Sequence, residues 1–205
     1  MAYKIPLESD HIYHIYNRGI DSCTIFYEER NYKLFLETYA KYASPAMDTL
    51  AYCLLGNHFH FLVRIKSEEE RTQLREKPSP KGKYITLNPS RQLGHLFNTY
   101  ANTINKTYKR TGSLFEEAFE RKKVDSNIYL TTLIDYIHKN PVKHGFTKDF
   151  RDYPHSSYQS HLSEKNTNLD RKMVVEWFGG KSELQKFHSQ EQDYDKIKDL
   201  IIEFD

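Results

Sequence analysis

The segment His58–Ile65, HFHFLVRI, alternates two kinds of side chain along its length. A period of two residues is typical of a β-strand, in which successive side chains point to opposite faces of the sheet. One face of this strand is wholly apolar and has to pack against the core: Phe59, Phe61, Val63 and Ile65. His58 and His60 therefore share the opposite face, with Cβ atoms about 7 Å apart, within reach of one ion. A lone histidine in a strand is more often structural, but this pair favours metal binding.

The segments on either side of this strand alternate between strand and helix patterns. Strands are predicted at 11–16, 49–55 and 121–124, and Gly56-Asn57 predicts a tight turn before the histidine strand. Apolar residues at helical spacing predict helices over 28–42, over 90–109 and from about 125 towards 140, and the last of these is expected to end near Pro141. This order favours an α+β fold, a ferredoxin-like antiparallel sheet of about four strands with helices on one face. The other face is expected to be open.

The rest of the chain is more polar. Residues 66–88 mix acidic and basic residues with two prolines and a glycine, which predicts an exposed, partly mobile connection. Beyond Gly145 the composition loosens, and the spacing of Ile197, Leu200, Ile201 and Phe204 predicts a terminal helix. We therefore expect one domain over residues 1–150 and a C-terminal helical appendage over residues 151–205.

The third predicted helix carries a second candidate set. Its buried stripe is expected to be Leu130, Leu133, Ile134 and Ile137. Tyr136 and Asn140 lie one turn apart on the flank of that stripe, which could place a phenolic oxygen and an amide oxygen beside an ion held by the histidines. The same spacing equally fits a boundary tyrosine and an asparagine that caps the helix.

Composition narrows the classes of partner. The 205 residues include 30 Lys+Arg and 28 Asp+Glu, for a formal net charge of +2, so contacts to nucleic acid have to come from local clusters of basic residues. The two cysteines, Cys23 and Cys53, are too few for a disulfide framework or a four-cysteine zinc site, which fits a reducing compartment. No apolar stretch approaches the roughly 18 residues of a membrane span, so we expect a cytoplasmic protein.

Two segments together resemble a known family. GNHFHFLV resembles the histidine-hydrophobic-histidine (HUH) motif, and YIHKNPVKHG resembles the tyrosine motif of single-tyrosine HUH transposases, the insertion-sequence and REP-associated tyrosine transposase group. Three further segments accompany them in the expected order: IYNRG, RTGSLFEEAFERKKV and DYPHSSY. Together these segments cover roughly residues 11–160, and their combination is far more specific than either motif alone.

The resemblance implies metal-dependent cleavage and strand transfer of single-stranded or hairpin DNA through a 5′-phosphotyrosine. Carried over by position, it makes Tyr136 the nucleophile and His58, His60 and Asn140 the ligands of Mg²⁺ or Mn²⁺. Candidate DNA contacts are Arg18, Lys106, Lys109, Arg110, Arg121, Lys122 and Lys123, with a possible further contribution from the tail. A homodimer is possible, because insertion-sequence relatives pair their sites between subunits, whereas REP-associated relatives need not.

Two other functions fit parts of the pattern. The same sheet could serve as a catalytically inactive module that binds single-stranded nucleic acid, although such a module needs neither the histidine pair nor the alignment of Tyr136 with Asn140. A metal-dependent hydrolase could use the histidines with water as the nucleophile. A histidine-triad nucleotide hydrolase is disfavoured, because Leu62 occupies the next alternate position after His60.

Overall fold

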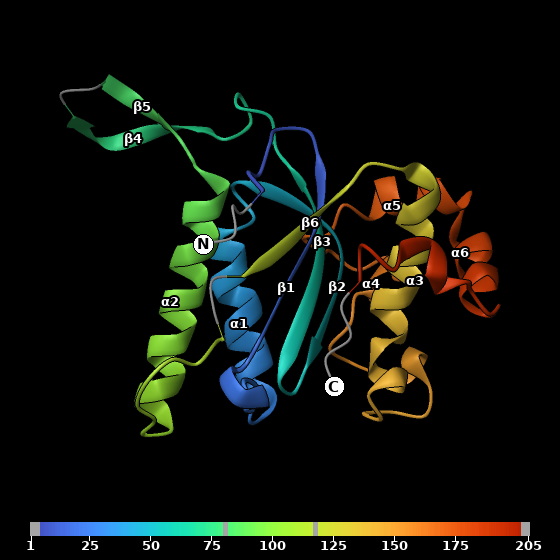
Figure 1. Cartoon of the computed structure of the whole chain (residues 1–205). Helices are drawn as coiled ribbons and strands as arrows, with labels where there is room; N and C mark the ends of the chain where they lie inside the picture. The colour runs from blue at the N-terminus through green and yellow to red at the C-terminus, as the bar shows by residue number, and fades with distance from the viewer. Residues whose placement is uncertain (1–4, 80–81, 117–118, 202–205) are drawn as a thin grey trace.

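A four-stranded antiparallel sheet organises the molecule (Figure 1). The structure, a computed structural model, describes residues 5–79, 82–116 and 119–201. The strands run in the order β2-β3-β1-β6, with bounds β1 Ile12–Arg18, β2 Met47–Leu55, β3 His58–Ile65 and β6 Glu120–Val124. The two middle strands are thus β1 and β3, the arrangement of a ferredoxin-like sheet. The predicted α+β class and antiparallel sheet are confirmed.

One face of the sheet packs against α1 (Glu29–Tyr42) and α2 (Pro89–Thr107). Its core is strongly aromatic: Phe59 contacts Phe35 at a ring-centroid distance of 5.2 Å and Phe97 at 5.5 Å. The helices form because their apolar residues recur every three to four positions, and Asn88 caps α2 by accepting a hydrogen bond from the Arg91 backbone N–H. This face was expected from the sequence.

The opposite face, expected to be open, is covered by α3 (Asn127–Lys143) and by the C-terminal segment (Figure 1). Leu133, Ile134 and Ile137 of α3 are fully buried and pack with Leu50 and Leu62 of the sheet. The physical reason is that the apolar stripe of α3 needs a partner, and this sheet face supplies apolar residues between its polar ones. The ferredoxin-like sheet is therefore sandwiched between two helical layers.

The C-terminal segment completes the second layer. It contains α4 (Tyr158–Leu162), α5 (Arg171–Phe178) and α6 (Lys181–His188), with short 3₁₀ turns at Phe150–Asp152 (η2) and Tyr194–Ile197 (η3). Val174, Leu184 and Ile197 from this segment are buried in the same apolar cluster as α3. The predicted terminal helix is wrong within the described residues, because Tyr194–Ile197 forms only the short turn η3; Phe204 lies outside them.

Two local predictions also differ from the structure. Residues 66–88, expected to be an irregular connection, contain the hairpin β4 (Thr72–Ser79) and β5 (Gly82–Thr86), which projects from the body in Figure 1. The end of helix α3, predicted near Pro141, lies two residues further along at Lys143. Pro141 lacks one helical N–H donor, but the helical hydrogen bonding continues past it, with the His144 backbone N–H donating to the Asn140 carbonyl oxygen, and Gly145 then ends the segment with a φ of +71°.

None of the helices in the described ranges is both long and apolar enough to cross a membrane.

Candidate active site

The two histidines of β3 lie in the middle of the sheet on the face that α3 covers. Residues that pair directly across antiparallel strands share a face, and on β1 Arg18 pairs with His58 while Tyr16 pairs with His60. The imidazole centroids of His58 and His60 are 5.2 Å apart. Both side chains are almost completely buried, at 1% and 0% exposure. Strand alternation thus places the pair where the sequence predicted, in a closed environment.

The two ring nitrogens of His58 have different neighbours. Its Nδ1 lies 2.8 Å from the side-chain oxygen of Asn57, and its Nε2 lies 3.4 Å from the side-chain oxygen of Asn140. Burial, followed by the neighbouring His144, lowers the pKa of His58 to about 3, so the ring carries a single proton. The shorter contact assigns that proton to Nδ1, which donates to Asn57. The Nε2 lone pair and the Asn140 oxygen therefore converge.

His60 is held by a different set of contacts. Its Nδ1 lies 3.0 Å from Nε2 of His14 on β1, and its ring meets the ring of Tyr136 edge-on at a centroid distance of 5.9 Å. Burial lowers the pKa of His60 well below its ordinary value, with His14 and His58 adding to the effect. His60 is therefore neutral and available as a metal ligand.

Helix α3 brings Tyr136 and Asn140 to the histidines. Their spacing of one turn aligns them on the sheet side, at 1% and 0% exposure. The Asn140 side-chain nitrogen lies 3.5 Å from the Tyr136 backbone oxygen, and the Asn140 oxygen faces His58. The four residues singled out from the sequence, His58, His60, Tyr136 and Asn140, come together in one buried site.

The donors at this site suit a divalent cation that keeps open coordination positions. Two neutral imidazoles and one amide oxygen could act as ligands, and the convergence of the His58 lone pair with the Asn140 oxygen is the arrangement that a cation stabilises. Within the described ranges, no group of three or more His, Cys, Asp or Glu residues could hold a metal. The amide oxygen is therefore essential to the candidate ligand set.

Several residues near the site were not singled out from the sequence. His14 contacts His60, the ammonium of Lys143 lies 5.4 Å from the ring centre of Tyr136, and Tyr194 of η3 meets Tyr136 edge-on at 5.5 Å. The Tyr194 hydroxyl donates to the buried carboxylate of Asp135, 2.7 Å away. The predicted strand 11–16 could have indicated His14, because strand alternation places His14 and Tyr16 on one face. Nothing in the sequence indicated that residues 194–200 return to the site.

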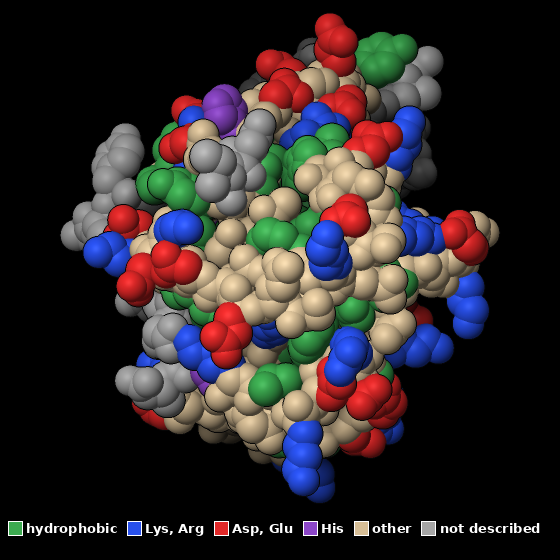
Figure 2. Space-filling model, turned by 90° about the vertical axis from the view of Figure 1, so that its right-hand side faces the viewer, with side chains coloured by type: hydrophobic (Ala, Val, Ile, Leu, Met, Phe, Trp, Pro, Cys, Tyr) green, Lys and Arg blue, Asp and Glu red, His purple; other side chains and the backbone are tan. Residues whose placement is uncertain are grey.

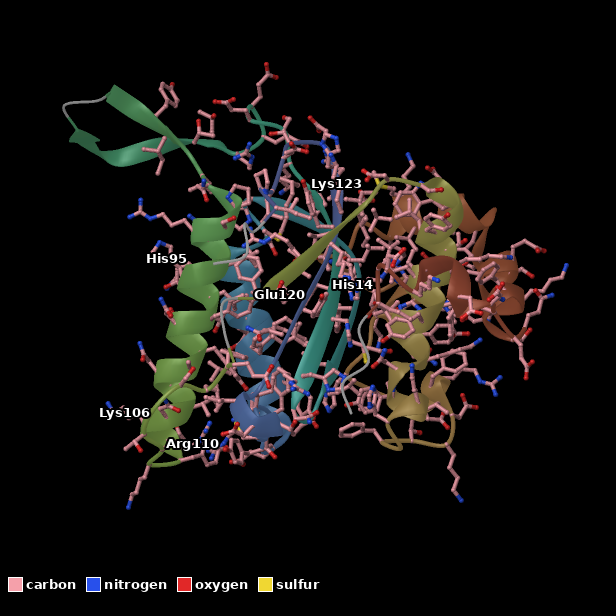
Figure 3. The ribbon with its side chains drawn as sticks, viewed as in Figure 1. His14, His95, Lys106, Arg110, Glu120 and Lys123 are labelled. Atoms are coloured by element: carbon pink, nitrogen blue, oxygen red, sulfur yellow. The ribbon has the colours of Figure 1, made fainter. Side chains whose placement is uncertain are left out.

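The candidate DNA contacts fall into separate groups. Arg18 shares the histidine face and forms an ion pair with Glu116 at 2.6 Å. Lys106, Lys109 and Arg110 lie at or just beyond the C-terminal end of α2, and Figure 3 shows Lys106 and Arg110 well away from His14.

The three consecutive basic residues of β6 divide between the two faces. Lys122 pairs with His14 and shares its face, whereas Arg121 and Lys123 pair with Ile15 and Tyr13 on the other face. Arg121 donates to Ser90, and Lys123 forms an ion pair with Glu8 at 2.7 Å. Figure 2 shows acidic and basic side chains interspersed over the side that carries the C-terminal helices. The structure therefore does not gather the seven candidates into a single patch.

Comparison with known proteins bears on this arrangement. No family model matches the chain. A REP-associated tyrosine transposase of Haemophilus influenzae is 27% identical over 111 residues, which make up 54% of this chain and 58% of that protein. A solved structure of a REP-associated tyrosine transposase bound to a REP hairpin superposes with a TM-score of 0.61, covering 80% of this chain and 86% of that one. The chain is thus similar in sequence and in fold to REP-associated tyrosine transposases.

The two comparisons carry different weight. The match to the Haemophilus protein spans less than two thirds of that relative's length. The structural match, at 13% sequence identity, is a likeness of fold. The comparisons therefore show a similarity to REP-associated tyrosine transposases and a shared α+β fold, while the reaction has to be argued from the residues of this chain.

Proposed function

We propose that this protein cleaves and rejoins single-stranded or hairpin DNA, with Tyr136 as the nucleophile and Mg²⁺ or Mn²⁺ as the cofactor. The observation that carries the proposal is the convergence of Tyr136 with His58, His60 and Asn140 in one buried site. The similarity in fold supports it, since the solved structure that superposes on this chain is a REP-associated tyrosine transposase in complex with a REP hairpin.

The proposed reaction is a transesterification. The Tyr136 hydroxyl oxygen attacks the scissile phosphorus, so that a tyrosine O–P bond forms and the P–O3′ bond breaks. The phenol gives up its proton, and the departing 3′ oxygen takes one up to become a free 3′-OH. The downstream strand is then joined to the protein through a 5′-phosphotyrosine. Because the phosphodiester energy is retained, another 3′-OH can reverse the step and rejoin strands without a nucleotide cofactor.

The residues around Tyr136 have distinct roles in this scheme. His58, His60 and Asn140 would hold the divalent cation, which polarises the phosphate and offsets charge that develops on its oxygens. Asn57 orients His58 by accepting a hydrogen bond from its Nδ1–H. Lys143 places a positive charge beside the ring of Tyr136. Together these groups favour attack by the phenolic oxygen at one fixed position.

Burial of the site favours single-stranded over duplex substrate. Tyr136, His58 and His60 are each at most 1% exposed, so a phosphate reaches them only after the protein opens locally around the site. A splayed strand or hairpin end can enter such a site, whereas a regular duplex holds its phosphates on a rigid outer surface.

An adduct assay tests the proposal. Hairpin oligonucleotides with a single-stranded flank and a 3′ fluorescent label are incubated with the full chain and Mn²⁺, then run on a denaturing protein gel. We expect a labelled band at the size of protein plus the downstream fragment, absent in Tyr136→Phe and after addition of EDTA.

Tyr100→Phe is the matched control. Tyr100 is equally buried, lies on the α1/α2 side and donates to the Ile25 carbonyl oxygen at 2.7 Å, so this variant should keep the adduct. An adduct that persists in Tyr136→Phe would refute the nucleophile assignment. Hairpin binding without any adduct in the unsubstituted chain would favour the inactive binding module instead.

A further inference from the structure

A third histidine of the sheet stands behind the candidate ligands. His14 lies on β1 in the middle of the sheet (Figure 3), on the same face as His60, and has no exposed surface. Its ring stacks on the ring of His60 at a centroid distance of 5.1 Å with an interplanar angle of 24°. Both of its ring nitrogens are engaged, one by His60 and the other by the backbone of the C-terminal segment.

These two contacts fix where the protons are. The Nδ1 of His14 lies 2.6 Å from the Leu200 carbonyl oxygen, which can only accept, so Nδ1 carries a proton and donates it. The ring is neutral, because it is fully buried and its charged neighbour is the cation Lys122, so that an imidazolium would be an unpaired buried charge. A neutral imidazole has one N–H, so the His14 Nε2 carries a lone pair.

The same logic extends to His60. Since the His14 Nε2 accepts, the proton in the 3.0 Å contact belongs to the Nδ1 of His60. His60 is thereby held in the Nδ1–H tautomer, with a lone pair on Nε2. Asn57 produces the same tautomer at His58 by accepting from its Nδ1. In both histidines of the pair Nδ1 then donates a hydrogen bond, to His14 or to Asn57, and Nε2 carries the lone pair that can bind a cation.

We propose that His14 is a positioning residue that holds His60 in its metal-binding tautomer, with the Leu200 carbonyl oxygen as the fixed end of the chain of hydrogen bonds. The chemical consequence of this tautomer rests on the proposed function. A group that accepts a hydrogen bond from the other ring N–H of a ligating histidine orients the imidazole and raises its basicity. Loss of such a group typically weakens metal affinity about 10–100-fold. A histidine that merely filled space would not set the proton position on its neighbour.

The tautomer is measured directly by long-range ¹H–¹⁵N correlation of the imidazoles in the metal-free, ¹⁵N-labelled full chain at pH 7.5. We expect His60 to show a protonated Nδ1 and an unprotonated Nε2. In His14→Phe, which keeps a ring but removes the acceptor, this preference should be lost. In His14→Gln, whose amide oxygen can still accept, it should persist. An Nε2–H tautomer in the unsubstituted chain, or an unchanged tautomer in folded His14→Phe, would overturn the proposal.

Metal affinity provides a second readout that needs no DNA. We expect calorimetric Mn²⁺ binding to weaken about 10–100-fold in His14→Phe and to stay within about threefold in His14→Gln. Affinity within twofold of the unsubstituted chain in folded His14→Phe would contradict a positioning role. The two proposals fail separately, because a chain with the expected His60 tautomer that never forms a DNA adduct refutes the proposed function alone.

Discussion

The two faces of the sheet are built from the same strands but have opposite chemistry. Towards α1 and α2, alternate residues such as Phe59 and Phe61 enter an aromatic core with Phe35 and Tyr100. Towards α3, the intervening residues of β3 include His58 and His60, which are equally buried, beside the apolar Leu62. Strand alternation thus lets one segment supply folding energy on one side and chemistry on the other.

Buried histidines continue beyond the site on the α3 side. His138 of α3 contacts His188 of α6 at 2.9 Å through its Nδ1 and Ser157 at 2.8 Å through its Nε2. The His188 Nδ1 in turn donates to the Leu184 carbonyl oxygen at 2.8 Å. This network ties the C-terminal helices to α3, so the second layer combines buried neutral imidazoles with an apolar cluster, whereas the first layer is mainly aromatic.

The largest expected effect on stability contrasts two adjacent residues of β3. Phe59→Ala should lower the free energy of unfolding by about 3–5 kcal/mol, because it removes a fully buried ring from the aromatic face. His58→Ala, one position earlier on the opposite face, should cost clearly less, because it deletes a smaller ring at a polar site. Urea-induced unfolding measures both. Equal losses would mean that the histidine face serves packing as much as the aromatic face does.

Acidification should destabilise the α3 side selectively. Burial lowers the pKa of His14 and His188 to about 4 and of His161 to about 3, whereas these residues titrate near 6.5 in the unfolded chain. Between pH 6.5 and about 4 the unfolded state therefore binds more protons, and stability falls as the pH falls. Asp135, whose pKa burial raises to about 6, opposes part of this loss.

We expect the free energy of unfolding to drop by about 4 kcal/mol between pH 7 and pH 5, measured by urea titration at each pH. His188→Gln should flatten this dependence, while His95→Gln, on the exposed surface of α2 (Figure 3), should leave it unchanged. A pH dependence that is identical in all three proteins would show that the buried histidines on the α3 side do not cause it.

The smallest expected effect contrasts two neighbouring lysines of β6. Lys122→Ala should weaken binding of a hairpin oligonucleotide about two- to fivefold and reduce the salt dependence by about one phosphate contact, because Lys122 shares the histidine face. Lys123→Ala should change neither quantity, because Lys123 lies on the other face and pairs with Glu8. Fluorescence anisotropy at several salt concentrations measures both. A larger loss of affinity in Lys123→Ala would indicate that DNA binds the opposite face of the sheet, which would contradict the proposed site.

The sequence predicted the parts of the fold that depend on short-range periodicity. The alternation in β3 placed His58 and His60 on one face, and helical spacing aligned Tyr136 with Asn140. Contacts between segments that are distant in the sequence were harder to predict from the sequence. The covering of the histidine face by α3 depends on how an apolar stripe finds its partner, and the return of Leu200 to His14 spans 186 residues.

Two local misjudgements have similarly physical causes. The β4–β5 hairpin projects from the body, with Tyr84 63% exposed, so no apolar alternation marks it. Pro141 suggested a nearby helix end, and the helix continues two residues further to Lys143, after which Gly145 ends the segment with a positive φ.

The most direct test of the central claim is to locate the DNA attachment by mass spectrometry. The adduct formed with hairpin DNA and Mn²⁺ is digested with trypsin and nuclease, and the modified peptide is fragmented. The account predicts a nucleotide joined through its 5′ phosphate to Tyr136, in the peptide that begins at Val124. Attachment to any other residue, or a complex that disappears on denaturation, would contradict it.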